Sequence, residues 1–458
     1  MKAGNSSGDV RSGNRNQQQQ QRTSNNKIIS TLHHLKKYKT NRDIESAIVR
    51  LGRKGRTDDA LHLYHAVWTL DRLKYQYRTK HSEKQTQNSK EEGRSKSVAS
   101  ESNIELQLFD KDDGREGTTL PPDLTTYVSK SKLRPTTRLM NSAIDACARS
   151  HPPARQSTAL DIFECAISPL NREDGTKKAG GALSPNVFTF GSLLACCARN
   201  GDIAASAELL RVLEAGEEYP DVALNEVLYS TVISACERAD VPDVELALEV
   251  LNRGVRTLYE GSKGVVVDNK ERKMKARTKG TMGVVGYNAA ISAMARSGRW
   301  KMAVQLLGEM ILHSRSSPKT PALSRSNPNF GPLESIRDNL DDPVRPLLQH
   351  TDIAGVTVPK PDGVTFGTVL AACERAGEWD RLLNVARAAT EYGIDLDGMA
   401  LTSALHSCQQ LGLAGEYLVH RGKMASMCEE PFVHIIWTLV ETTTFNIQSL
   451  LLLTYSLC

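Results

Sequence analysis

The sequence predicts an all-α fold, an α-solenoid built from helix-turn-helix repeats with long loop insertions. The first observation is a hairpin pattern at residues 284–310, which read VVGYNAAISAMARSGRWKMAVQLLGEM. Apolar residues recur there every three or four positions on both sides of Ser297-Gly298, which is the spacing of one helix face. Glycine favours the left-handed backbone that ends a helix. The second observation is repetition, because the helix AAISAMARSG is matched by SAIDACARS, SLLACCARN, TVISACERAD, TVLAACERAG and SALHSCQQLG.

The repeated helices share one column of small or flexible apolar residues. Its members are Cys147, Cys197, Cys236, Met294, Cys373 and Cys408. The last two are 35 residues apart, which is the bare repeat length, and the longer intervals contain inserted loops. A period near 35 residues with two helices per unit is typical of an α-solenoid, in which each repeat packs on its neighbours. We expect the column to be buried packing and not a metal site, because the chain has no C-x-x-C pair.

The openings of the repeats carry a family resemblance. PNVFTFGSLL, PDGVTFGTVL and GVVGYNAAI resemble the start of the pentatricopeptide repeat, and the turn glycines Gly201, Gly298, Gly377 and Gly412 fit it as well. The resemblance covers Thr137 to about Pro431, with a degenerate hairpin over 41–67. It implies a right-handed superhelix whose first helices line a groove for single-stranded RNA, with one base read per repeat.

The resemblance also implies three sets of RNA-binding residues. The first set follows the aromatic position of each first helix: Asn141, Gly191, Ser230, Asn288, Gly367 and Thr402. The second set is the last residue before the next repeat: Asn186, Asn225, Gly283, Asp362 and Asp397. The third set is apolar and wedges between bases: Phe188, Val227, Val285, Val364 and Met399. Glycine offers no side chain, so only Asn141 with Asn186, Asn288 with Asp362, and Thr402 can act as readers. A polar residue at a helix start is also the usual cap, which is the alternative for each reader.

The clearest reader is the pair Asn288 and Asp362, for which the resemblance implies a preference for uracil. An Asn amide both donates to and accepts from a pyrimidine edge, while an ionised Asp only accepts. The insertion over 313–358 lies between the two residues, so they converge only if it loops out.

The rest of the chain divides by composition. Residues 1–40 hold a glutamine run among basic and hydroxylated residues, which predicts a disordered basic region; the same composition is that of an organelle transit peptide. The expected order is then a degenerate hairpin that caps the array at 41–75, a disordered polar insertion at 76–136, the repeat array at 137–431 with insertions, and an apolar segment at 432–458. Polar residues interrupt that last segment, so a membrane span is disfavoured, and a cap or an aberrant chain end fits it equally well.

Chemistry beyond binding has little support in the sequence. His81-Ser82-Glu83 matches the H-x-E of zinc deaminases, but the paired cysteines of that motif do not follow. We therefore expect no enzyme activity, no metal and no cofactor. The modest net charge of +5 alone indicates no particular partner.

Two function classes remain. One is a sequence-selective single-stranded RNA-binding adaptor in a mitochondrion or plastid that acts in RNA processing, stability or translation, with possible protein partners in an RNA-processing complex. The other is a protein-binding α-solenoid of tetratricopeptide-like character. The repeat start discriminates them, because Val-Thr-aromatic after Pro-Asp or Pro-Asn favours RNA, and the tetratricopeptide Trp-x-x-Leu-Gly pattern is absent from the sequence.

Overall fold

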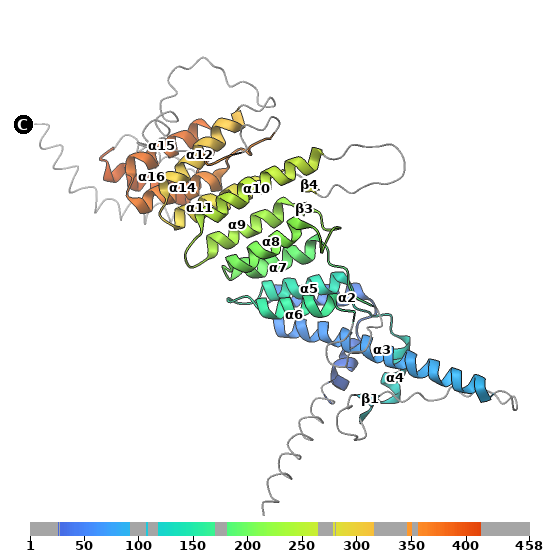
Figure 1. Ribbon diagram of the computed structural model, residues 1–458. Helices are drawn as coiled ribbons and strands as arrows, with labels where there is room; N and C mark the ends of the chain where they lie inside the picture. Colours follow the sequence, from blue (N-terminus) through green and yellow to red (C-terminus); the bar gives the residue numbers. More distant parts are fainter. Residues whose placement is uncertain are drawn as a thin grey trace, which may run out of the picture. The chain divides into compact units, whose positions relative to one another are not determined.

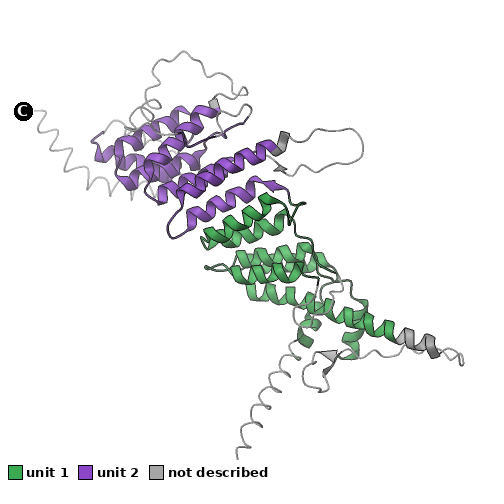
Figure 2. Ribbon diagram, in the orientation of Figure 1, with its two compact units in different colours: residues 1–222 green, residues 223–458 purple. Residues whose placement is uncertain are grey.

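The computed structural model describes most of the helical hairpins and parts of their connections. Its described residues are 26, 28–91, 107–108, 118–169, 181–263, 278–279, 281–315, 346–349 and 356–413. The chain forms two compact units, Met1–Val222 and Ala223–Cys458 (Figure 2). The apolar segment 432–458 and residues 1–25 lie outside the described residues, so the predictions made for them stay predictions.

The first unit is a row of antiparallel helix pairs (Figure 1). After a helical stretch at 28–35, its helices are α2 (Asn41–Arg53), α3 (Thr57–Glu91), α4 (Pro122–Lys130), α5 (Thr137–Ala148), α6 (Gln156–Ile167), α7 (Val187–Arg199) and α8 (Ile203–Ala215). Strands β1 (Gln107–Leu108) and β2 (Thr118–Thr119) form a short antiparallel ladder. The first helices of successive pairs pack on one another, α2 on α5 and α5 on α7.

The second unit repeats the same arrangement. Its elements are β3 (Leu224–Asn225), α9 (Glu226–Arg238), α10 (Val244–Lys263), β4 (Thr278–Lys279), α11 (Val284–Arg296), α12 (Trp300–Arg315), α14 (Gly363–Ala376), α15 (Trp379–Glu391) and α16 (Gly398–Gln410). The two short strands pair in parallel. First helices α9, α11, α14 and α16 pack in chain order, which confirms the all-α repeat fold within each unit. The right-handed superhelix stays a prediction.

The ends of the helices follow from local sequence. Asn186 and Asp362 begin α7 and α14, and each side chain accepts a hydrogen bond from the backbone of the threonine three residues later. Such a cap satisfies a donor that the first helical turn leaves unpaired. Gly377 ends α14 with φ +73°, a conformation that a side chain would strain. These signals fix where each hairpin starts and turns.

The cysteine column lies in the core, as predicted. All six members are 2% exposed or less. Burial raises the pKa of the thiols, to about 11 for Cys147 and to about 12 for Cys236 and Cys373. The column is therefore packed as neutral apolar groups, and Cys408 of α16 shares a core cluster with Leu383 of α15.

The N-terminal part contains more helix than the sequence predicted. Residues 28–35 are helical rather than disordered, with Leu32 and Leu35 fully buried. The expected polar insertion at 76–136 is helical at both ends, since α3 extends to Glu91 and α4 buries Leu124 and Val128. The end of α3 has no apolar stripe, so the prediction by periodicity missed it, while its Lys, Gln and Glu residues favour helix by intrinsic propensity. None of the described helices is both long and apolar enough to cross a bilayer.

Candidate nucleic-acid interface

The second residue of five first helices is an exposed apolar side chain. The exposed fractions are 73% for Phe188, 55% for Val227, 61% for Val285, 63% for Val364 and 81% for Met399. Two positions later the side chain is buried, as Phe190, Tyr229, Tyr287, Phe366 and Leu401 show. Leaving large apolar groups in water is unfavourable, so their recurrence at one helix position makes them candidates for a ligand-binding surface. These are the five residues for which the family resemblance implies a place between bases.

In the second unit the predicted pair converges. Asn288 Nδ2 donates to Asp362 Oδ1 at 3.1 Å, across the insertion between α12 and α14. Thr365, a buried residue in the first turn of α14, completes the cluster: its hydroxyl donates to Asn288 Oδ1 at 2.6 Å and accepts from the Asp362 backbone at 3.0 Å. We call these three residues the α11–α14 triad.

The first unit contains a second triad of the same geometry, from α5 and α7. Asn141 Nδ2 donates to Asn186 Oδ1 at 3.1 Å. Thr189 donates to Asn141 Oδ1 at 2.7 Å and accepts from the Asn186 backbone at 3.0 Å. The two triads differ only in the cap, an amide in one and a carboxylate in the other. The two threonines were not among the predicted RNA-binding residues, although the shared Val-Thr-aromatic or Phe-Thr-aromatic start contained them.

The threonine and the Asp362 cap together orient the asparagine amide. Which end of an amide is nitrogen follows from its hydrogen-bond network. The Thr365 hydroxyl accepts from the Asp362 backbone and lies 2.6 Å from Asn288 Oδ1 and 2.9 Å from Asp362 Oδ1, so it has an acceptor in each residue, and the Asp362 carboxylate needs a donor from Asn288. The amide nitrogen must then face Asp362. This leaves on Asn288 one N–H and one oxygen lone pair for a ligand, which is a donor and an acceptor side by side.

The Asp362 carboxyl is held in its ionised form. Burial alone would raise its pKa, but hydrogen bonds from the Thr365 backbone, from Asn288 and from the Thr365 hydroxyl outweigh burial and hold the pKa below its usual range. At neutral pH Asp362 therefore accepts hydrogen bonds only. The amide of Asn186 in the other triad can also donate.

The triads separate the cap interpretation from the reader interpretation. Asn186, Asn225, Asp362 and Asp397 are all N-caps, with side chains that accept from the first turn of their helices. Asn141 and Asn288 are not caps, because each lies in its helix four residues after the helix begins. Capping thus accounts for four of the five residues of the second predicted set, all but Gly283, and leaves the two asparagines of the first set without that role.

The remaining predicted positions have less to offer a base as hydrogen-bonding groups. A Cβ atom added at Gly191 or Gly367 would meet nothing within 4 Å, so both helix positions face open space but supply no polar group. Ser230 is only 7% exposed, and a Cβ at Gly283 would lie 2.8 Å from the Glu226 carboxylate. Thr402 donates its hydroxyl back to the Gly398 carbonyl at 2.7 Å.

The first hairpin takes part in the same pattern. Thr136 caps α5 and donates to Glu45 of α2 at 3.2 Å, and Arg138 lies 3.7 Å from the same carboxylate. Glu45 occupies the position in α2 that Asn141 and Asn288 occupy in their helices. The pairing between a first helix and the next cap thus begins at α2.

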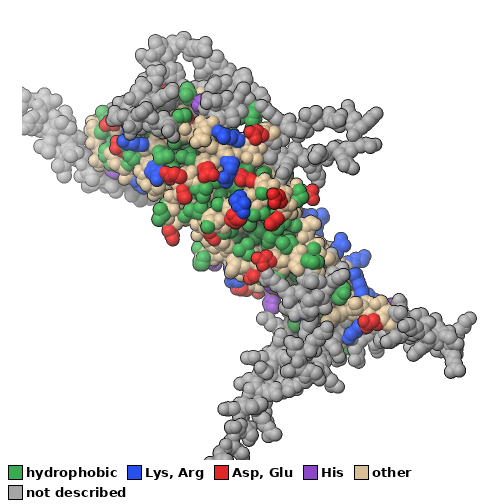
Figure 3. All heavy atoms as spheres, viewed as in Figure 1, with side chains coloured by type: hydrophobic (Ala, Val, Ile, Leu, Met, Phe, Trp, Pro, Cys, Tyr) green, Lys and Arg blue, Asp and Glu red, His purple; other side chains and the backbone are tan. Residues whose placement is uncertain are grey.

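Charge is spread rather than gathered on the face shown in Figure 3, where Lys and Arg side chains alternate with Asp and Glu.

Stacked antiparallel helix pairs with repeated caps and turn glycines define a helical repeat protein. Residues 285–314, which comprise most of α11 and α12, match the family model of the PPR repeat. The chain therefore contains a pentatricopeptide repeat, and the resemblance seen in the sequence is confirmed.

Solved structures give a more distant likeness. The pentatricopeptide repeat protein PPR10 from maize is 14% identical, with a TM-score of 0.37 over 84% of this chain and 39% of that one. PPR10 in complex with an 18-nt psaJ RNA element is 13% identical, with a TM-score of 0.20 over 85% of this chain and 56% of that one. The chain thus spans about two fifths to just over half of the length of these structures. No curated protein matches the chain.

Proposed function

We propose that this protein is an adaptor that binds single-stranded RNA, with the two triads reading bases and the exposed apolar residues stacking between them. The observation that carries the proposal is the repetition of one hydrogen-bonded triad, Asn141–Asn186–Thr189 and Asn288–Asp362–Thr365, beside exposed apolar groups. A splayed base offers a flat face for stacking and an edge of donors and acceptors. Both needs are met at the start of the same helices.

The cellular role is part of the proposal. The basic, acid-poor composition of residues 1–40 supports import into a mitochondrion or plastid. There the protein would act on the processing, stability or translation of a transcript, alone or with protein partners. The binding surface, not a catalytic group, would be its contribution.

Binding to single-stranded RNA is tested by titrating the full chain against a labelled RNA pool and against duplex DNA of equal length. We expect tighter binding to the RNA, with affinity that falls as salt rises because phosphate contacts release counterions. Equal affinity for duplex DNA, or no binding to RNA at low salt by a folded sample, would contradict the proposal. Selective capture of peptides in place of RNA would favour the protein-binding scaffold.

The apolar surface is tested with a matched pair of variants. Phe188→Ala removes a stacking side chain and should weaken RNA binding by about 1 kcal/mol, or roughly fivefold. Val241→Ala is the control, because Val241 is 81% exposed and lies outside the helix starts. The control should bind like wild type. Equal losses in the two variants would show that the effect is not specific to this surface.

A further inference from the structure

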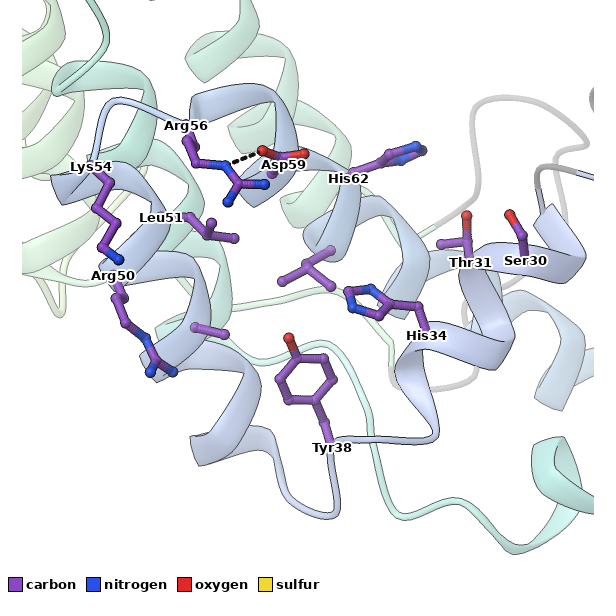
Figure 4. A pocket seen from close by; sticks show the side chains of 12 residues that line it. Ser30, Thr31, His34, Tyr38, Arg50, Leu51, Lys54, Arg56, Asp59 and His62 are labelled. Atoms are coloured by element: carbon purple, nitrogen blue, oxygen red, sulfur yellow. Dashed lines mark hydrogen bonds and ion pairs between the residues drawn. The ribbon is translucent and has the colours of Figure 1, made fainter.

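A cavity of about 480 Å³ lies at the N-terminal end of the first unit, between the helical stretch 28–35, α2 and α3 (Figure 4). Its residues on α2 are Ala47, Arg50 and Leu51, and with Lys54, the C-cap of α2, they recur at helical spacing along one face. That face is turned away from α5, because Gly52, roughly on the opposite side of α2, packs against Ala146 of α5. In later hairpins the corresponding face is covered by the preceding first helix. The volume of the cavity is that of a small-ligand site.

The cavity carries an excess of positive charge. Arg50, Lys54 and Arg56 line it, against one carboxylate, Asp59. Arg56 Nε pairs with Asp59 at 2.7 Å, whereas among the described residues Arg50 and Lys54 have no ion-pair partner. Both side chains are exposed and can reach a ligand in the cavity. Two uncompensated cations match the charge of a phosphomonoester, which is about −1.5 to −2 at pH 7.

The same cavity has an aromatic wall. Tyr38 and His34 both point into the space between the helices in Figure 4. Their ring centroids are 5.9 Å apart with planes at 82°, so one ring presents its edge to the other. A flat heteroaromatic group entering the cavity meets these rings and, beyond them, the cations. Stacking and charge pairing are then satisfied in one ligand.

We propose that this cavity binds a nucleotide with a terminal phosphomonoester, with the phosphate at Arg50 and Lys54 and the base against Tyr38 and His34. The ligand is the phosphorylated end of a bound RNA or a free mononucleotide, which share this chemistry. The first source rests on the proposed function, and the second does not. Internal phosphodiesters carry a single charge and match the site less well.

The test uses the full chain and three single-stranded RNAs of one sequence, with a 5′-phosphate, a 3′-phosphate or hydroxyls at both ends. Uridine monophosphate alone is the fourth probe. The variant is Arg50→Gln with Lys54→Gln, which keeps side-chain bulk at two exposed positions. The control is Arg78→Gln, which removes one positive charge from α3 roughly four turns beyond the cavity.

We expect wild type and the control to bind one of the phosphorylated RNAs about tenfold more tightly than the hydroxyl RNA, and the double variant to lose that preference. Binding of uridine monophosphate that the double variant abolishes would assign the site to a free nucleotide. The proposal is overturned if wild type prefers no phosphorylated probe, or if the preference survives in the double variant. The hydroxyl RNA lacks a terminal phosphate, so its affinity tests RNA binding without the cavity. The proposed function and the cavity proposal can therefore be contradicted independently.

Discussion

Asn288 donates a hydrogen bond to Asp362 at 3.1 Å although the two residues are 74 positions apart. Part of the chain between these two residues, the segment 346–349, is hydrogen-bonded to α12 and α10. Glu309 of α12 accepts from the backbone of Leu347 at 2.9 Å and of Leu348 at 2.8 Å. Asn252 of α10 donates to the Leu347 carbonyl and accepts from the Gln349 backbone, both at 2.9 Å. The segment 346–349 is thereby clamped to two helices.

The threonine of the triad should set base selectivity without touching RNA. Thr365→Val keeps the shape but removes the hydroxyl that donates to Asn288 Oδ1. The amide then keeps only its hydrogen bond to Asp362 and can tilt, which loosens the placement of its donor and acceptor. We expect a broadened base preference at one RNA position with about threefold or smaller change in overall affinity. Base-substituted RNAs measure both quantities, and Thr368→Val, on an exposed hydroxyl of the same helix, is the control. An unchanged preference in Thr365→Val would show that the amide is oriented by other contacts.

An open helix position should accept a new reader. Gly367→Asn places an amide where a Cβ meets nothing within 4 Å, and Asp397 caps the next helix. Asparagine costs no more than glycine in a helix, so stability should be kept. We expect the variant to gain a base preference at one RNA position that wild type lacks. Gly191→Asn is a second such change in the other unit. A folded Gly367→Asn protein with the wild-type base profile would show that this position does not face RNA.

The clamp on 346–349 should be a local stabiliser. Glu309→Gln offers one acceptor to two backbone N–H groups, and an unpaired group costs about 1–3 kcal/mol where it is buried. We expect hydrogen exchange in 346–349 to accelerate by roughly tenfold or more. Glu249→Gln on α10, whose carboxylate pairs with Arg253, should leave that exchange unchanged. Equal protection in the two variants would mean that other contacts hold the segment.

The Asp362 carboxylate should make stability depend on acidity. Its pKa is lowered in the folded protein, so its contribution is present above the unfolded pKa and is lost as pH falls through the folded pKa. We therefore expect the stability difference between wild type and Asp362→Asn to shrink as pH falls from about 5 to about 3. Urea unfolding at several pH values measures it. A difference that stays constant over that range would contradict the assigned charge state.

Much of this arrangement could be predicted from the sequence, and the reasons for the exceptions are physical. Periodicity located the hairpins and the buried column, because both depend on residues close in sequence. The exposed positions at Phe188 and Val285 followed from the family resemblance. The convergence of Asn288 with Asp362 stayed conditional, because the path of the long connection between them could not be predicted: Glu309 and Asn252 bind the backbone of 346–349, and backbone recognition has no sequence pattern. The helical stretch at 28–35 was not predicted, because the buried pair Leu32 and Leu35 is too short an apolar pattern to indicate a helix.

The central claim is that Asn288 reads a base. A randomised-RNA selection on wild type and on Asn288→Thr tests it most directly, with sequencing of the bound pools. The resemblance to the family implies uracil at one position for wild type. Asn288→Thr should shift that position from pyrimidine towards purine, at a cost of ~1–3 kcal/mol for the original base by analogy with other base contacts. The same base profile from both proteins would contradict the account and leave Asn288 as a structural partner of the Asp362 cap.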